Sequence, residues 1–284
     1  MLDVAPIDSK SMAKFKSEGR LNVSLDALFD NVKTNIRRGL PQIHPHEVNH
    51  ETALLVCSGA SLADTENELV EAYWNGGKIM AVNGAYKWCL EHNLKPSAVS
   101  ILDARPHNAR FLERAAPRCK YMLASQCHPM LFDMCKDRET YIWHACSGGD
   151  EEYDLLKEYY FKRVFPVEGG TTVGIRTIFM LRMLGFTKIE IFGLDSCWLG
   201  DRHHAFEQPE NDDKRHMVWL SPDGRDDKAE KFWCANWHMK QAQDFQELIK
   251  KRGDMFELRV HGDGLIAAIL RIGAEIQMET KNGS

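Results

Sequence analysis

The sequence lacks the features that mark several large classes of protein. No window approaches the ~18 uninterrupted apolar residues that a membrane helix needs. None of the 8 cysteines belongs to a CxxC pair, so the spacing of a zinc ribbon or a disulfide scaffold is missing. The N-terminal stretch MLDVAPIDSKSMAKFKSEGR has no apolar centre of the kind found in secretory signals. These absences predict a cytoplasmic protein without a membrane span, whose cysteines are mostly reduced core residues.

Two well-known phosphate-binding signatures are also missing. The chain contains no GxxxxGK[ST] motif and no GxGxxG motif, so neither a P-loop nor a Rossmann-type NAD site has support. The net charge of −5 argues against a protein that coats nucleic acid by bulk electrostatics. A ligand must therefore be inferred from less specific patterns.

What is present is typical of a globular protein. The 284 residues are 44% hydrophobic and 27% charged, which suits one large α/β domain or two small ones. Residues 1–50 read as an N-terminal helical appendage, in which Ser24 caps the amphipathic stretch SLDALFDNVKTNIRRG. The polar segment 44–50 reads as a loop. We expect residues 51–284 to form the main domain.

Short apolar runs alternate with helical stretches from residue 52 onward, which favours a Rossmann-like, mostly parallel sheet with helices on both faces. The long polar stretch 198–227 interrupts this order and is expected to be a lid loop. We predict strands over 52–57, 78–82, 98–103, 120–125, 140–145, 188–195 and 255–262. We predict helices over 62–77, 84–92, 107–116, 228–253, within 167–185 and after 263.

Four small residues follow the first predicted strand: Ser58, Gly59, Ala60 and Ser61. A small-residue turn that opens a helix presents backbone N–H groups and a positive dipole end to an anion. A tight structural turn would need the same residue types. Taken alone, the stretch favours neither reading.

The stretch EGGTTVG repeats this device before a later helix. Gly169 and Gly170 supply the turn, while Thr171 and Thr172 could cap the helix or bind a phosphate or sugar hydroxyl. Two such turns in one sheet favour a nucleotide or nucleotide-sugar site more than either turn does alone.

Polar residues stand at the ends of three predicted strands. Asp103 and Asp195 could bind a ribose or sugar hydroxyl, hold Mg²⁺ or act as a base. Asn83 lies at the same edge of the sheet and could bind a base or sugar. The alternatives are an N-cap for each aspartate and a simple Asn-Gly turn for Asn83.

The stretch RHHAF begins the long polar segment. A histidine there can act as a general base or bind a diphosphate. Adjacent side chains point in different directions, so we expect at most one of His203 and His204 to be catalytic. Arg202 or Arg105 could neutralise a phosphate.

The ordered set LLVCSGASL, AVNGAY, SILDARP, EGGTTVGIRTIFMLRMLGFTKIEIFGLDSCW and HHAF resembles one family over residues 50–205. This family groups 6-hydroxymethylpterin diphosphokinase MptE-like proteins with the motility-associated-factor glycosyltransferases and, more distantly, the bacterial sialyltransferases. Ala60 stands where the family usually has proline, and Ser58 stands where it usually has glycine. Small size is kept at both positions.

The resemblance implies a nucleotide-activated donor and gives each motif a role. The turn from Ser58 to Ser61 would hold phosphate, and Asn83 with Asp103 would face the nucleoside or donor sugar. The residues that would line the donor are Gly169, Gly170, Thr171 and Thr172, and those near the transfer chemistry are Asp195 and His204.

Three functions follow from this set. The favoured one is a glycosyltransferase that uses a CMP- or UDP-linked sugar to modify a hydroxyl on a glycan, a protein or a modified nucleobase. A Mg²⁺-dependent diphosphokinase acting from ATP on a small hydroxymethyl compound is the second. A non-catalytic binding or assembly protein is the third, and a second copy of the chain stays among the partners to test.

Overall fold

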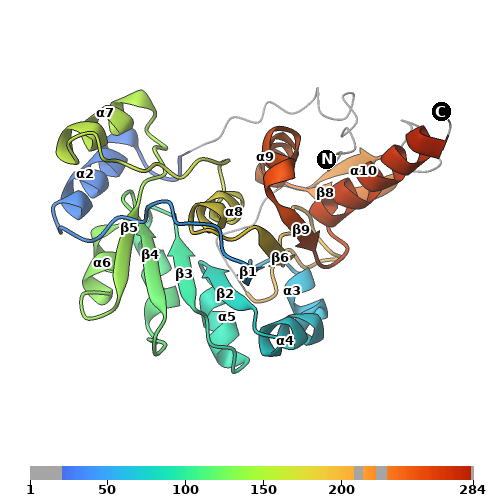
Figure 1. Cartoon of the computed structure of the whole chain (residues 1–284), viewed down its shortest axis with the longest axis horizontal. Helices are drawn as coiled ribbons and strands as arrows, with labels where there is room; N and C mark the ends of the chain where they lie inside the picture. Colours follow the sequence, from blue (N-terminus) through green and yellow to red (C-terminus); the bar gives the residue numbers. More distant parts are fainter. Residues whose placement is uncertain (1–20, 208–213, 222–228, 283–284) are drawn as a thin grey trace.

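A computed structural model describes residues 21–207, 214–221 and 229–282 (Figure 1). Its main feature is a seven-stranded sheet in which every paired strand is parallel. The strand order β5-β4-β3-β2-β1-β6-β9 and the flanking helices confirm the predicted α/β architecture. The strands are β1 (Thr52–Val56), β2 (Lys78–Val82), β3 (Ala98–Ile101), β4 (Lys120–Ala124), β5 (Thr140–Trp143), β6 (Lys188–Phe192) and β9 (Glu257–Val260).

Helices cover both faces of this sheet. Helix α8 contacts β1, β2 and β3, while α4 contacts β1 and α5 contacts β2, and Figure 1 shows α8 on one side with α4 and α5 on the other. The helices are α2 (Leu25–Ile36), α3 (Ser61–Asp64), α4 (Glu66–Trp74), α5 (Ala85–Glu91), α6 (Pro129–Met134), α7 (Asp150–Tyr159), α8 (Val173–Met183), α9 (Asn236–Arg252) and α10 (Leu265–Asn282). Short 3₁₀ helices η1 (Pro106–Leu112) and η3 (Gly253–Met255) complete them.

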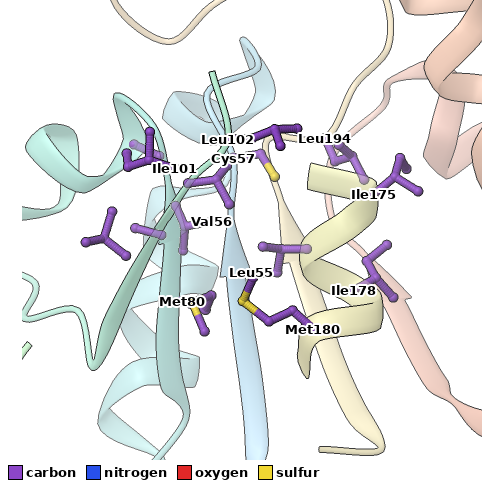
Figure 2. Close-up of a cluster of buried hydrophobic side chains, with 14 of the residues drawn as sticks. Leu55, Val56, Cys57, Met80, Ile101, Leu102, Ile175, Ile178, Met180 and Leu194 are labelled. Atoms are coloured by element: carbon purple, nitrogen blue, oxygen red, sulfur yellow. The ribbon is translucent and has the colours of Figure 1, made fainter. Parts of the chain in front are cut away.

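The core between α8 and the sheet explains the continuous apolar runs. Met180 of α8 extends toward Leu55 of β1 and Met80 of β2, and all three side chains are almost fully buried (Figure 2). A strand covered on both faces must be apolar at consecutive positions, since neither face meets water. This is why β1 to β4 read as unbroken hydrophobic stretches.

The chain reverses its direction of travel across the sheet at β1. It runs outward from β1 to β5 and then crosses to β6, which pairs with the free side of β1 through Val56 and Phe192. In open parallel sheets, ligands bind in the crevice outside the carboxyl ends of the strands at such a switch point. This topology places the small-residue turn after β1 beside the turn after β6.

One predicted helix is wrong in its first part. Residues 230–234 form β8 (Glu230–Cys234), which pairs antiparallel with β7 (His216–Leu220), and α9 begins only at Asn236. Buried Phe232 and Cys234 alternate with exposed Lys231 and Trp233, which is the period of a strand with one face covered. The predicted lid at 198–227 therefore includes a strand, and its segments 208–213 and 222–227 lie outside the described residues.

The N-terminal helix is confirmed and packs into the same body. Ser24 caps α2 by accepting from the Ala27 N–H at 3.3 Å, while Leu28 and Val32 are fully buried. Asn35 donates to the Ser125 and Cys127 carbonyls at 2.9 and 2.7 Å. The domain boundary at residue 50 stays a prediction, but α2 is part of the core packing.

No helix within the described part of the chain has the length and hydropathy needed to cross a membrane.

Candidate functional site

A cavity of about 1010 Å³ lies at the carboxyl ends of the central strands. Its walls come from the turns after β1, β2, β3 and β6, from η1, from the start of α8 and from α9. The predicted site residues that line it are Ser58, Gly59, Asn83, Asp103, Thr171, Thr172, Asp195 and His204. Ala60, Ser61, Gly169 and Gly170 do not line it.

The turn after β1 binds a carboxylate of the chain itself. The Ser61 N–H donates to Asp195 Oδ2 at 2.8 Å, and the Ser61 hydroxyl donates to Asp195 Oδ1. The Gly59 N–H is also used, since it donates to the Gly193 carbonyl at 2.8 Å. Asp195 therefore occupies the start of α3, where an anionic ligand was expected; the phosphate role of this turn stays a prediction.

The small size of the turn follows from this packing. A Cβ on Gly59 would lie 2.5 Å from Asp195 Oδ2 and 2.6 Å from the Gly193 carbonyl oxygen. From the other side, a Cβ on Gly264 would lie 2.6 Å from Asp195 Cα. The close approach that requires glycine here is the chain's own Asp195.

Burial sets the protonation behaviour of Asp195. Asp195 is only 4% exposed. Its removal from water raises the pKa of the carboxyl, despite the two hydrogen bonds from Ser61. With both oxygens engaged, Asp195 holds the two turns together. Its predicted catalytic role stays a prediction.

The second glycine-rich turn repeats the arrangement with a residue that the sequence analysis missed. The Thr171 N–H and hydroxyl donate to Asp244 Oδ2 at 2.7 and 3.0 Å, and Lys240 forms an ion pair with the same carboxylate. A Cβ on Gly170 would lie 2.1 Å from Asp244 Oδ2. Lys240 and Asp244 are four residues apart on α9, a helical ion-pair spacing that could have drawn attention to them.

Asp103 lies at the cavity wall in a tight ion pair. The Arg105 guanidinium donates to both carboxylate oxygens, with Nη2 2.5 Å from Oδ2, and the Arg105 N–H adds a bond of 2.9 Å. Burial alone would raise the pKa of the Asp103 carboxyl, but the Arg105 hydrogen bonds and charge outweigh it and lower the pKa. Asp103 therefore presents an ionised, already paired carboxylate.

Asn83 follows β2 with a left-handed backbone, at a φ of 45°. Its Oδ1 is buried and has no hydrogen-bond partner among the residues that the structure describes. A buried acceptor without a partner is costly, so Asn83 is held where a ligand donor would satisfy it.

His204 is positioned by the same β1 turn. Its Nδ1 lies 3.1 Å from the Ser58 carbonyl oxygen, and because a carbonyl only accepts, Nδ1 carries the proton of the neutral ring. Nε2 is then the basic nitrogen. Burial, and to a smaller extent the neighbouring His203, lower the pKa of His204 to about 4. His204 is a neutral imidazole near pH 7.

Cationic side chains outnumber carboxylates around the cavity. Asp103 and Asp195 are the acidic residues among those lining it, and both are engaged by other side chains. The lining lysines and arginines are Arg105, Arg110, Lys214 and Lys240. In a chain of net charge −5, this lining reverses the overall sign and favours an anionic ligand.

The structure does not assemble a metal centre from the residues it describes. Among them, no three or more histidine, cysteine, aspartate or glutamate side chains gather as ligands for a metal ion.

The comparisons with known proteins agree on family and fold. The family model described as "6-hydroxymethylpterin diphosphokinase MptE-like" matches residues 26–201. No curated protein matches the sequence. The structure of a MAf glycosyltransferase from Magnetospirillum magneticum AMB-1 is similar with a TM-score of 0.63 at 15% identity. The match covers 93% of this chain but 42% of that one, so this chain spans less than half of its neighbour's length.

A more distant similarity extends to a mammalian sialyltransferase. It has a TM-score of 0.41 at 10% identity and covers 92% of this chain and 90% of that one. The same kind of enzyme in complex with Gal-beta-1-3GalNAc-ortho-nitrophenol gives 0.40 at 9% identity.

Proposed function

The chain belongs to the 6-hydroxymethylpterin diphosphokinase MptE-like family, and from that premise we propose that it is a glycosyltransferase using a nucleotide-activated sugar. The cavity at the sheet's switch point carries this proposal. Its volume of about 1010 Å³ is large enough for a nucleotide sugar with an acceptor group, and its cationic lining suits the donor phosphates. The fold shared with the MAf glycosyltransferase over 93% of the chain supports it.

His204 supplies the chemistry of the proposed transfer. With Nδ1–H held by the Ser58 carbonyl, Nε2 accepts the proton of an acceptor hydroxyl. The hydroxyl oxygen then forms a bond to the anomeric carbon, and the bond from that carbon to the phosphate oxygen breaks. The nucleotide leaves with the electron pair of the broken bond, while the proton stays on His204. Asp195, which holds the β1 and β6 turns together, keeps the base and the donor in register.

Arginine and lysine side chains would stabilise the leaving phosphate. Lys240 and Lys214 line the cavity on the side of α9 and β7, and Arg110 lines it on the side of η1. A donor linked to CMP or UDP carries one or two phosphates that these charges would neutralise as the bond breaks.

The diphosphokinase named by the family model is the second candidate. That reaction moves pyrophosphate from ATP and needs Mg²⁺ bound by carboxylates. The two carboxylates available at the cavity are already taken, Asp103 by Arg105 and Asp195 by Ser61, so their donor set does not fit a Mg²⁺ site. This favours the glycosyltransferase.

A ligand screen separates these functions. Thermal unfolding is measured with CMP, UDP, GDP and ATP, each with and without Mg²⁺, and with cytidine and uridine as controls that lack phosphate. We expect CMP or UDP to raise the unfolding temperature, and we do not expect a rise that occurs only with ATP and Mg²⁺ together. The rise is measurable because a ligand at 100 times its Kd stabilises the fold by about 2.7 kcal/mol.

Two results would count against the proposal. Stabilisation by ATP with Mg²⁺ alone would support the diphosphokinase instead. A chain that responds to none of the nucleotides would support the non-catalytic alternative.

A further inference from the structure

A chain of buried and partly buried polar side chains crosses one wall of the cavity. The Ser196 hydroxyl donates to Gln241 Oε1 at 2.7 Å, and Gln241 Nε2 donates to Thr172 Oγ1 at 2.7 Å. Ser196 follows β6, Gln241 belongs to α9, and Thr172 precedes α8. The chain therefore links three elements, and all three residues line the cavity.

Gln241 fixes which group donates and which accepts in these hydrogen bonds. Its side chain belongs to a residue that is 7% exposed, and its amide can only accept at oxygen and donate at nitrogen. The Ser196 proton is therefore committed to Gln241, which leaves the Ser196 oxygen as an acceptor. Thr172 Oγ1 accepts a hydrogen bond from the Gln241 amide, which leaves the Thr172 hydroxyl proton to donate elsewhere.

The backbone keeps both hydroxyls available to a ligand. Thr172 stands at the N-cap of α8, yet its side chain makes no capping hydrogen bond to its own helix. Ser196 is held at a φ of 55°, a left-handed conformation that a non-glycine residue adopts only when its surroundings impose it. The two side chains are thus positioned by contacts beyond their own turns.

We propose that Gln241 is a positioning residue that makes Thr172 a hydrogen-bond donor to an anionic oxygen of the bound nucleotide. It makes the Ser196 oxygen the matching acceptor for a ligand hydroxyl or amine. This wall then selects a ligand that carries a phosphoryl oxygen beside a hydrogen-bond donor. The inference rests on the proposed function, because it assigns the anion to the nucleotide phosphate.

The substitution Gln241→Glu reverses the direction of the hydrogen bond between residue 241 and Thr172, and it keeps the bond from Ser196. A carboxylate still accepts from Ser196, but it cannot donate, so Thr172 must turn its proton toward Glu and away from the cavity. A hydrogen bond to a charged group is then lost at the ligand phosphate. We expect affinity for CMP or UDP to fall about 10- to 100-fold, while affinity for cytidine or uridine changes less than about 2-fold.

Two controls separate positioning from added charge. Gln243→Glu makes the same change two residues along α9, at a residue that does not line the cavity, and is expected to leave nucleotide affinity unchanged. Thr172→Val removes the donor directly. If Gln241 acts through Thr172, the double variant Gln241→Glu/Thr172→Val loses no more nucleotide affinity than Thr172→Val alone. If the two residues act independently, their losses of affinity add.

The measurement is isothermal titration of each folded variant with the nucleotide and its nucleoside. Weakened nucleotide binding, intact nucleoside binding and a non-additive double variant support the inference. Equal weakening of nucleotide and nucleoside, additive losses, or native affinity in Gln241→Glu would overturn it while leaving the proposed function intact. If the native chain binds no nucleotide at all, the inference and the proposed function fall together.

Discussion

Each glycine-rich turn at the cavity binds a carboxylate from elsewhere in the chain. Asp195 accepts from Ser61, and Asp244 accepts from Thr171, in the positions where helix N-termini commonly hold phosphate. A ligand phosphate would compete with these internal anions for the same N–H groups. We therefore expect the ligand to bind lining residues that these carboxylates do not engage, such as Thr172 and Ser58.

At the scale of single residues, His204 and His203 offer a matched pair. Both line the cavity, and their ring centroids are 4.3 Å apart. If Nε2 of His204 takes the acceptor proton, His204→Gln lowers kcat by about 10²- to 10⁴-fold, because that is the usual contribution of a general base. His203→Gln, which keeps the base, is expected to retain most of the activity. The readout is nucleotide release from the CMP- or UDP-linked sugar whose nucleotide stabilises the chain.

The pH profile of the unsubstituted chain and of His203→Gln, which both keep His204, tests the environment of His204. The neutral ring is the active form, so a pKa of about 4 keeps kcat/KM flat from pH 7 down to about 5, with a loss only below. An ordinary histidine would lose activity already below about pH 6.5. Because the folded pKa is lowered, the unfolded chain binds the proton first, and His204 costs stability as the pH falls from about 6.5 to about 4. Equal activity of His203→Gln and His204→Gln would remove His204 from the mechanism.

At the scale of elements, the contact between α8 and α9 depends on the fit of Gly170 against Asp244. A methyl group on Gly170 would stand 2.1 Å from Asp244 Oδ2, so Gly170→Ala must displace a carboxylate held by Thr171 and Lys240. We expect Gly170→Ala to lower the free energy of unfolding by about 1–3 kcal/mol, because the hydrogen bonds and the ion pair of the Asp244 carboxylate are lost together.

The rescue by a second substitution identifies the cause. In an Asp244→Ala background the obstructing carboxylate is gone, so adding Gly170→Ala is expected to cost little more, and urea unfolding of the four-member cycle measures this coupling. Strictly additive losses would show that Gly170 is needed for its backbone and not for the space that Asp244 fills.

Elements with continuous apolar runs were predictable, and those with mixed patterns were not. The strands β1 to β4 begin at their predicted residues because burial on both faces removes polar positions. The segment DEEYDLLKEY, which forms α7, has so many charged residues that its helical stripe was missed. In KAEKFWC, residues that favour helices concealed the alternation of buried and exposed positions in β8. The strand forms because it pairs with β7.

The same division holds for the site. Asn83, Asp103 and Asp195 were predictable at one edge, since parallel strands bring their carboxyl ends together. Gln241 and Asp244 were not, because they meet Thr172 and Thr171 across 69 and 73 residues of chain. Helix periodicity gives the faces of α9 but not the turn against which it packs.

At the scale of the whole molecule, the cavity needs α2, which belongs to the segment 1–50 that the sequence pattern predicts to be an appendage. Leu28 of α2 lines the cavity and is fully buried, as is Val32, and Ile36 is 3% exposed. The Asn35 amide also satisfies the Ser125 and Cys127 carbonyls beyond β4. Removing α2 would expose an apolar surface of the sheet domain and leave these carbonyls without their donor.

A chain that begins at residue 51 tests whether residues 1–50 are a separate appendage. Burying an aliphatic side chain contributes about 1.5–3 kcal/mol, so losing Leu28, Val32 and Ile36 removes about 5–9 kcal/mol, close to the whole stability of an ordinary domain. We expect residues 51–284 to lack a cooperative unfolding transition by circular dichroism, whereas residues 21–284 keep one. A truncated chain that unfolds cooperatively near the temperature of the full chain would make residue 50 a true domain boundary, with α2 an accessory to the cavity.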